Sequence, residues 1–238
     1  KLTNEAFPRL SVVRTIRPDG ALYLGPLPSA KAAKRVAEAI ETAVPLRRCT
    51  ACPSRQQRTG PCAPAQIGVS TCPCAGQIGQ DDYAQIVATV RRGLLQEPAL
   101  LLGPLEQKMH ALAAAERFEE AAEMRDRAAA LTVALRRQRR FDALRRTGRL
   151  VLEVGGRSGA ELDHGRLVRS WVIGSEGPRD VPLPLDLDPA APDALGATRP
   201  ADADDLDAPG SPLPKSVADE LACVAAWLDK EAGRIRVV

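Results

Sequence analysis

The sequence is poor in aromatic residues and has no long apolar run. Aromatic side chains make up 3% of the 238 residues, whereas hydrophobic residues together make up 45%. A folded core must therefore be mostly aliphatic and rich in alanine, which favours helices that pack closely on small side chains. No apolar stretch has the length of a signal peptide or of a membrane-spanning helix, so we expect no membrane partner.

Histidine is also scarce, and it occurs only at His110 and His164. Neither lies in a cluster of residues suited to a metal-dependent nuclease site. The aspartates of residues 186–207 lie in a segment rich in proline and alanine, where solvated linker charge explains them better than a two-metal site. We therefore expect no catalytic residue in this chain.

The net charge of +3 is too small to establish nucleic-acid binding by itself. Its distribution is more informative, because arginine and lysine concentrate in residues 9–58 and 134–149, whereas aspartate concentrates in residues 186–207. Such a polarised chain can steer a polyanion towards one side. For the basic run at 134–149 the sequence leaves two interpretations open, a solvated helix face and a phosphate-binding face.

Cysteine, in contrast, is abundant in one place, because five of the six cysteines lie within residues 49–74. They are Cys49, Cys52, Cys62, Cys72 and Cys74. Proline and glycine interrupt this segment, so it needs support other than a regular helix or strand, and four thiolates around a metal ion or an iron–sulfur cluster would supply it. Only the first two have C-x-x-C spacing, so the spacing leaves zinc and iron–sulfur both open. The sixth, Cys223, is interpreted as a small buried hydrophobe on a helix.

Hydrophobic periodicity predicts a mainly helical α+β fold. A short β-hairpin is expected within residues 7–24, because apolar and polar residues alternate around Pro18-Asp19-Gly20. Two helices should follow, one over residues 30–43 with Ser29 as its N-cap and one from Asp81 or Asp82 to about Leu95.

The strongest helical signal covers residues 104–146, where two apolar stripes separated near 115–117 predict an antiparallel helical hairpin. From residue 148 the period changes, and residues 150–154 and 167–173 are expected to be strands. A flexible segment (186–213) and a closing helix (216–231) complete the chain. These elements predict three parts: a Cys-rich domain (1–98), the helical hairpin (99–147) and a small α/β C-terminal region (148–238).

Several short motifs occur in one order along the first half of the chain. They are Phe7-Pro-Arg-Leu10, Tyr23-Leu-Gly-Pro26, Pro45-Leu-Arg-Arg-Cys49, Gly60-Pro-Cys62, Gln66-Ile-Gly68 and Pro73-Cys-Ala-Gly76. This run resembles the central region of UvrC, the nuclease subunit of bacterial nucleotide excision repair. Through Phe118-Glu119, Ala121-Ala122 and Arg125-Asp126, the helical hairpin resembles that family's UVR motif, the element that docks UvrB. The resemblance covers roughly residues 1–146.

The resemblance implies a [4Fe–4S] cluster held by four cysteines. Cys49, Cys62 and Cys74 match three of the ligand positions. The fourth position falls on Ser70, and we expect Cys72 to replace it, with Cys52 in reserve. Zinc is the alternative cofactor.

The resemblance also implies DNA binding and a UvrB-like partner. The basic residues expected to contact phosphates are Arg14, Arg17, Lys31, Lys34, Arg35, Arg47, Arg48, Arg55 and Arg58. The partner-binding face would consist of Phe118, Ala121, Ala122 and Arg125, although Phe118 fits the core of the hairpin equally well. The competing hypothesis is a zinc-stapled protein-interaction module that binds no DNA.

In this family a GIY-YIG nuclease domain should precede Lys1, so we interpret the chain as a fragment of a longer, cytoplasmic repair nuclease. The catalytic residues of that domain, and of the RNase H-like nuclease that should follow, do not occur in the sequence. The parent is expected to be a UvrC, a shortened protein of the Cho type, or a fusion of a DnaQ-like exonuclease with the front half of UvrC. Residues 148–238 would then be a divergent, non-catalytic remnant.

Overall fold

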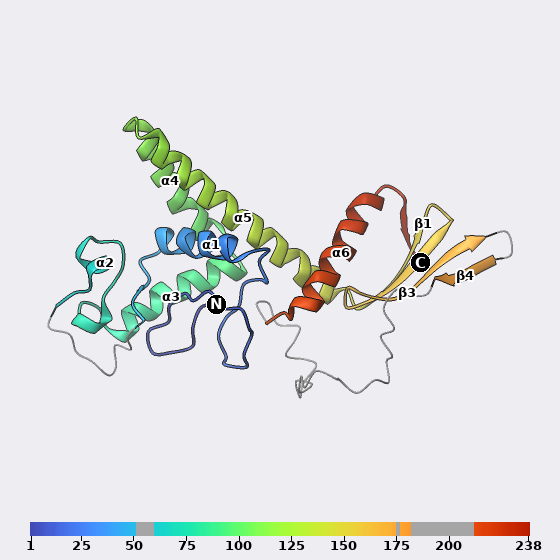
Figure 1. Cartoon of the computed structure of the whole chain (residues 1–238), viewed down its shortest axis with the longest axis horizontal. Coiled ribbons are helices and arrows are strands. Elements are labelled where there is room, and N and C mark those ends of the chain that lie inside the picture. The colour runs from blue at the N-terminus through green and yellow to red at the C-terminus, as the bar shows by residue number, and fades with distance from the viewer. Residues whose placement is uncertain (51–59, 175–176, 182–211) are drawn as a thin grey trace. The chain divides into compact units, whose positions relative to one another are not determined.

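The computed structural model describes residues 1–50, 60–174, 177–181 and 212–238. It forms two compact units, Lys1–Gln138 and Arg139–Val238 (Figure 1). Helices build the first unit, and an antiparallel sheet with a helix makes up most of the second, which confirms the mainly helical α+β class. Among these described residues, no helix combines the length and the apolar character needed to cross a bilayer.

The helices of the first unit enclose an aliphatic core. They are α1 (Ala30–Ala43), α2 (Ala63–Gln66), η1 (Pro73–Ala75), α3 (Gln80–Leu95), α4 (Ala99–Ala114) and α5 (Phe118–Arg146), the last of which continues into the second unit. α1 has the predicted bounds, and the Ser29 hydroxyl accepts a hydrogen bond from the Ala32 amide at 3.1 Å, as expected for an N-cap. Val36 and Ile40 of α1 are buried in the same cluster as Leu101 of α4.

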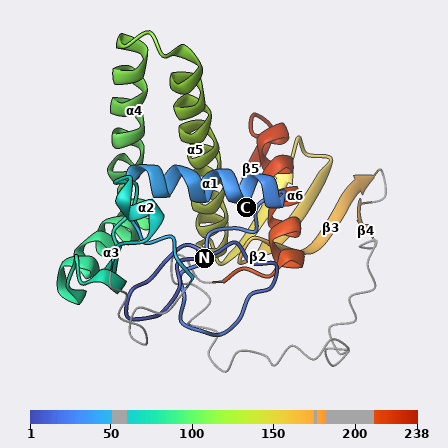
Figure 2. The same ribbon diagram turned by 60° about the vertical axis from the view of Figure 1, so that its left-hand side comes forward.

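α4 and α5 form the predicted antiparallel helical hairpin (Figure 2). Between them, Glu116 adopts a left-handed φ of 60°, and the Arg117 amide donates to the Leu112 carbonyl at 2.9 Å, which closes the end of α4. α3 lies close against α4, because Gly93 has no side chain where Leu101 is packed. A Cβ atom on Gly93 would approach the Leu101 Cγ to 2.5 Å.

The N-terminal segment differs from the prediction. Residues 7–24 do not form a β-hairpin; instead, Leu2 makes isolated antiparallel bridges to Leu10 and to Leu22. Two prolines within the segment lack the amide donors that a continuous ladder needs. Leu2 and Leu22 are buried in the same core as α1, so hydrophobic burial holds the segment in place of a ladder.

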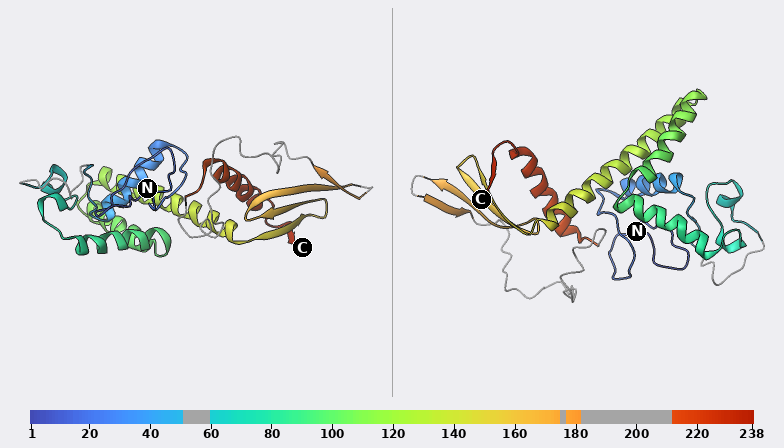
Figure 3. Two further views of the ribbon diagram at one scale, coloured as in Figure 1. Left: turned by 90° about the horizontal axis from the view of Figure 1, so that it is seen from below. Right: turned by 180° about the vertical axis from the view of Figure 1, so that it is seen from behind.

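The second unit contains an antiparallel sheet, drawn mainly in yellow and orange in Figure 3. The sheet has five strands in the order β4-β3-β2-β1-β5. Its strands are β1 (Arg149–Val154), β2 (Ser158–Asp163), β3 (Arg166–Gly174), β4 (Gly177–Val181) and β5 (Ile235–Val237). β1 and β3 lie where the sequence predicts strands, whereas the sequence pattern misses the other three. In β2 the pattern is hidden by Gly159, which lies under the indole ring of Trp171: a Cβ there would approach that ring to 2.2 Å.

Helix α6 (Lys215–Glu231) packs on one face of this sheet. Its Val224 joins Leu152 of β1 and Leu162 of β2 in a buried cluster. Its Leu221 joins Phe141 and Leu144 from the end of α5 in another. The closing helix is therefore present as predicted and supplies the core of the second unit.

The structure of the second unit differs from the sequence-based expectations at Cys223 and Leu213. Cys223 is exposed rather than buried, because it lies on a side of α6 away from the buried cluster residues, so its interpretation as a core residue is wrong. Leu213, at the end of the predicted flexible segment, is 3% exposed and belongs to the core with Phe141. Residues 186–211 of that segment lie outside the described residues. The three-part division of the chain at residues 98 and 147 stays a prediction.

Candidate cysteine site and basic surface

The structure brings four of the five clustered cysteines together. Cys49 follows the end of α1, Cys62 precedes α2, and Cys72 and Cys74 flank the start of η1. The sulfur atoms of Cys49 and Cys74 lie 3.8 Å apart, and the Cys62 amide donates to the Cys72 sulfur at 3.4 Å. The Cys72 thiol also interacts with the thiols of Cys62 and Cys74. The reserve ligand Cys52 lies outside the described residues.

A threonine holds the two halves of this segment together. The Thr71 amide and the Thr71 hydroxyl both donate to the Pro45 carbonyl, at 3.1 and 2.9 Å. These bonds keep the chain around Cys72 beside the segment that leads from α1 to Cys49. Ser70, the position where the family resemblance places a ligand, is 7% exposed, and its hydroxyl has no hydrogen-bond partner among the described residues. Cys72 is fully buried, so its sulfur lies in the interior and not at the surface.

The pKa values of the thiols separate Cys72 from its neighbours. Burial, together with the thiol of Cys49, raises the pKa of Cys74 to about 11. Burial also raises the pKa of Cys62. Burial acts in the same direction on Cys72, but hydrogen bonds from the Cys62 amide and thiol outweigh it, so the pKa of Cys72 is lowered. Cys72 therefore loses its proton more readily than Cys62 or Cys74, and the thiolate is the form that binds metals.

The donor set fits a thiolate-bound metal in kind, and one pair fits it in distance. Two thiolates on one tetrahedral zinc ion lie about 3.8 Å apart, because each Zn–S bond is about 2.3 Å long. The Cys49 and Cys74 sulfurs have that separation. Across residues 1–50, 60–174, 177–181 and 212–238, however, no group of three His, Cys, Asp or Glu side chains is arranged to hold a metal ion. A complete set of four ligands therefore remains a proposal.

Arg47 has a different role from the one that the sequence suggests. Its side chain is 0% exposed, and its guanidinium bonds to the Glu5 carboxylate at 2.8 Å, to the Phe7 carbonyl at 2.6 Å and to the Cys49 carbonyl at 2.6 Å. A buried guanidinium with three such partners cannot also reach a phosphate on the surface. The expectation that Arg47 contacts DNA is therefore corrected: this side chain supports the cysteine segment.

Tyr83 of α3 completes the support of Arg47. Its hydroxyl accepts a hydrogen bond from the Arg47 amide at 2.9 Å and donates one to the Pro8 carbonyl at 2.7 Å. Its ring packs edge-on against Phe7, with the ring centroids 5.4 Å apart. The sequence analysis does not single out Tyr83 or Glu5. The available signal for Tyr83 was the scarcity of tyrosine, since only two occur in the chain. A buried tyrosine usually has a hydrogen-bond partner, so each of the two could have been considered as a structural contact.

Six of the predicted DNA-contacting residues are exposed in the first unit. They are Arg14, Arg17, Lys31, Lys34, Arg35 and Arg48. Three of them have the i, i+3, i+4 spacing that places side chains on one face of α1. Arg35 forms an ion pair with Asp126 at 3.9 Å, and Arg48 forms one with Glu41 at 3.3 Å. The remaining two, Arg55 and Arg58, lie outside the described residues.

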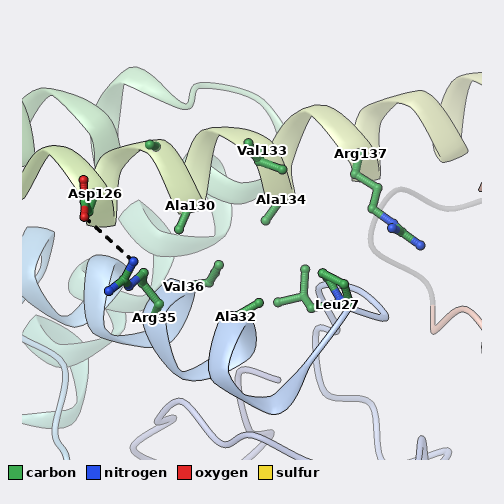
Figure 4. A pocket seen from close by; sticks show the side chains of 11 residues that line it. Leu27, Ala32, Arg35, Val36, Asp126, Ala130, Val133, Ala134 and Arg137 are labelled. Atoms are coloured by element: carbon green, nitrogen blue, oxygen red, sulfur yellow. Dashed lines mark ion pairs between the residues drawn. The ribbon is translucent and has the colours of Figure 1, made fainter.

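A groove of about 480 Å³ lies between α1 and α5, and Arg35 is the residue of this basic face that lines it (Figure 4). Leu27, Ala32 and Val36 line one wall, and alanines and Val133 of α5 line the other. Val133 is 66% exposed, although it is apolar. Arg35 and Asp126 join the two walls through their ion pair.

The predicted partner-binding residues lie at the start of α5 with unequal exposure. Phe118 is 66% exposed, so it does not belong to the hairpin core. Arg125 is also exposed and pairs with Asp126 at 3.0 Å. Ala121 is buried in the hairpin, and Ala122 is half-buried. Phe118 and Arg125 are therefore available to a partner, whereas Ala121 packs inside.

The basic end of α5 is partly occupied by contacts within the second unit. Arg140 bonds to the Asp229 carboxylate at 2.6 Å and to the Ala225 carbonyl at 2.6 Å. Arg145 is only 8% exposed. Arg136, in contrast, is exposed to solvent. This run is therefore neither a uniformly solvated face nor a continuous phosphate-binding face.

Comparison with known protein families identifies two regions of the chain. Residues 1–93 match the family described as the UvrC/Cho excinuclease middle domain, and residues 100–131 match the UvrB/uvrC motif. The first part of the chain therefore contains the UvrC/Cho middle domain followed by the UvrB/uvrC motif, as its motifs predict. No solved structure matches the chain significantly.

Individual relatives extend this result. The UvrABC system protein C of Thermus thermophilus is 40% identical over 131 residues, which are 55% of this chain and 22% of that protein. The UvrABC system protein C of Syntrophus aciditrophicus is 39% identical over 136 residues, covering 57% of this chain and 22% of that protein. A putative bifunctional exonuclease/endonuclease protein of Mycobacterium tuberculosis is 33% identical over 242 residues, covering 98% of this chain and 35% of that protein. The chain thus spans between 22% and 35% of the length of these relatives.

Proposed function

We propose that this chain is a DNA-binding and partner-binding portion of a UvrC-like repair nuclease, which positions DNA for a nuclease domain elsewhere in the polypeptide. The observation that carries the proposal is a combination of features in the first unit. The region that matches the UvrC/Cho middle domain has six exposed basic side chains, and it also contains the cysteine segment, which buried side chains support. The similarity to a bifunctional exonuclease/endonuclease supports a parent that joins this portion to a nuclease.

DNA binding would rest on the basic side chains of α1 and its flanking loops. Lysine and arginine contacts to phosphates give affinity without sequence preference, which suits a protein that acts beside lesions of many shapes. Lys31 and Lys34 have no ion pair among the described residues, so their charges are open to phosphates. Arg47 is excluded from this surface because it is buried.

The partner would be a UvrB-like protein that docks on the tip of the α4–α5 hairpin. An exposed phenylalanine at the start of a helix, beside an exposed arginine, is the composition that protein interfaces favour. Phe118 and Arg125 meet that description. The match of residues 100–131 to the UvrB/uvrC motif supports this partner class.

The cofactor would be a [4Fe–4S] cluster held by Cys49, Cys62, Cys72 and Cys74. When bound, such a group would staple a segment that has few regular elements of its own. The lowered pKa of Cys72 supports it as the ligand that replaces Ser70. Iron and zinc analysis of anaerobically purified protein, together with its visible absorbance, tests this proposal.

A zinc-stapled interaction module without DNA binding is the second candidate function. The 3.8 Å between the Cys49 and Cys74 sulfurs favours it, because that is the separation of two thiolates on one zinc ion. Ligands of a cluster approach different irons, so they are expected to lie farther apart. Colourless protein with stoichiometric zinc and no affinity for DNA would establish this alternative.

The DNA-binding proposal is tested by charge reversal with a matched control. In the double variant K31E/K34E, both changes lie on the exposed face of α1. The double variant K108E/K230E makes the same change in net charge at exposed lysines of α4 and α6. We expect the first variant to bind a fluorescent bubble duplex at least about tenfold more weakly, because two phosphate contacts become repulsive, and the control to stay within about threefold. Equal losses in the two variants would refute this placement of the DNA surface.

A further inference from the structure

The most unusual polar group of the first unit is the buried guanidinium of Arg47. Burying a charged side chain is costly unless it is paired and fully hydrogen-bonded. The partners among the described residues include the Glu5 carboxylate and the Phe7 carbonyl from one segment and the Cys49 carbonyl from another. Arg47 therefore connects the N-terminal segment to the first cysteine of the site.

The same guanidinium also lies beside the Cys49 sulfur. Its Nη1 atom, which bonds to the Cys49 carbonyl, is 3.8 Å from the Cys49 Sγ. That sulfur is in turn 3.8 Å from the Cys74 sulfur. A positive charge is thus built into the wall of the cysteine cluster, in an interior where charges interact more strongly than in water.

The electrostatic effect on the Cys49 sulfur depends on the ion pair of Arg47 with Glu5 and not on Arg47 alone. The Glu5 carboxylate binds the other terminal nitrogen of Arg47 at 2.8 Å and neutralises part of its charge. The Glu5 side chain is 32% exposed, whereas that of Arg47 is not exposed at all. The carboxylate can therefore be altered at the surface while the guanidinium stays inside.

We infer that Arg47 is a positioning residue for the cysteine site: it fixes the Cys49 backbone, its charge stabilises the negative charge of a metal–thiolate complex, and Glu5 opposes that charge. This inference rests on the proposed metal-binding cysteines, but it is independent of DNA binding.

The charge balance gives the sign of the effect. When four thiols bind Zn²⁺ they release four protons, and the bound site changes from neutral thiols to a complex of net charge −2. A neighbouring cation stabilises that negative charge, and a carboxylate beside the cation weakens its effect. Loss of the cation should therefore weaken zinc binding, and loss of the carboxylate should strengthen it.

The experiment measures the affinity of the whole 238-residue chain for Zn²⁺ by competition with a chelator at neutral pH under reducing conditions. We expect R47M to bind zinc at least about tenfold more weakly than the unchanged chain, and E5Q to bind it at least about threefold more tightly. R47K keeps the charge but loses the planar fork, so its affinity should lie between those of R47M and the unchanged chain. R48M is the matched control, because the Arg48 side chain pairs with Glu41 instead, and it should change the affinity less than twofold.

A second readout separates charge from general loosening of the fold. Co²⁺ replaces Zn²⁺ in the titration, and its thiolate absorption band reports the ligands directly. E5Q and R47M should shift cobalt affinity in opposite directions, which a merely structural defect would not do. If R47M does not fold by circular dichroism, E5Q and R47K still decide the matter.

The possible outcomes are distinct. Equal zinc affinity of R47M and the unchanged chain overturns the inference, as does weakening by E5Q. Absence of zinc and cobalt binding by the unchanged chain overturns both this inference and the cysteine site, while leaving the DNA-binding proposal to its own test.

Discussion

Replacement of Tyr83 by phenylalanine is a sharp test of the support beneath the cysteine segment. The ring of Tyr83 is 0% exposed, and phenylalanine would preserve its contact with Phe7. Only the hydroxyl is lost, and with it the bonds to the Arg47 amide and to the Pro8 carbonyl. The change therefore isolates two hydrogen bonds from the hydrophobic contribution of the ring.

The magnitude follows from what the change leaves behind. The buried Arg47 amide loses its acceptor, and an unsatisfied buried donor costs about 1–3 kcal/mol. The bond to the Pro8 carbonyl contributes about 1 kcal/mol more. We expect Y83F to lower the free energy of unfolding of the first unit by about 2–4 kcal/mol.

The assay can distinguish the two units. Both tryptophans, Trp171 and Trp227, lie in the second unit, so their fluorescence follows that unit, whereas circular dichroism also follows the helices of the first. In urea, Y83F should move the circular dichroism transition to lower concentration and leave the fluorescence transition in place. Y23F is the matched control, because the Tyr23 hydroxyl makes longer contacts of 3.1–3.3 Å within a local turn. A loss below about 0.5 kcal/mol in Y83F, or an equal loss in Y23F, would refute the reasoning.

The remaining predictions concern helix contact, pH and ion pairing. G93A should destabilise the first unit by about 1–3 kcal/mol, because its methyl group would collide with Leu101. G103A should stabilise the same unit by about 0.5–1 kcal/mol, because a Cβ at Gly103 has no neighbour within 4 Å and alanine favours the helix. Urea titration checks both variants. Burial raises the pKa of Tyr83, so the stability that this shift contributes is complete below the unfolded-state pKa of about 10 and is lost as the pH rises through the folded-state value. Y83F lacks this loss, so its deficit in stability relative to the unchanged chain should narrow as the pH rises above about 10, which urea titration at a series of pH values checks. The Arg140 guanidinium lowers the pKa of Asp229, so this pair stabilises the second unit above about pH 4 and ceases to do so as the pH falls through the lowered value. D229N should therefore lower the fluorescence midpoint in urea at pH 7, and this difference should shrink as the pH falls below about 4 and through the lowered folded-state pKa.

Local periodicity predicted the elements whose apolar faces meet a core. The helix over 30–43 and the break between the two hairpin helices were predicted from spacing and capping, because both signals lie within a few residues of the element they define. The β-hairpin over 7–24 failed because alternation there reflects burial of single leucines against Leu2, which is distant in sequence from Leu22. Strand β2 was missed because Gly159 interrupts its pattern. This glycine leaves room for the Trp171 ring of the neighbouring strand, and neighbouring residues in the sequence do not reveal that contact.

The candidate site shows the same division between local and distant information. The clustering of the cysteines in the sequence indicates a site, and the structure brings the Cys49 and Cys74 sulfurs to 3.8 Å from each other. The sequence between them has no regular hydrophobic pattern that would have predicted this approach. Arg47 looks like its exposed neighbour Arg48 in the sequence, and only the positions of Glu5 and Tyr83 reveal that it is buried. A basic cluster therefore indicates a charged surface, but it does not identify which arginines face solvent.

The salt dependence of DNA binding tests the central claim most directly. The equilibrium affinity of the whole chain for a bubble duplex would be measured across a series of salt concentrations. Six exposed basic residues are available in the first unit, and each phosphate contact to duplex DNA contributes about −0.9 to the slope of log affinity against log salt. The account predicts a linear fall with a slope between about −3 and −5. A slope near zero, or no binding at low salt, would contradict it.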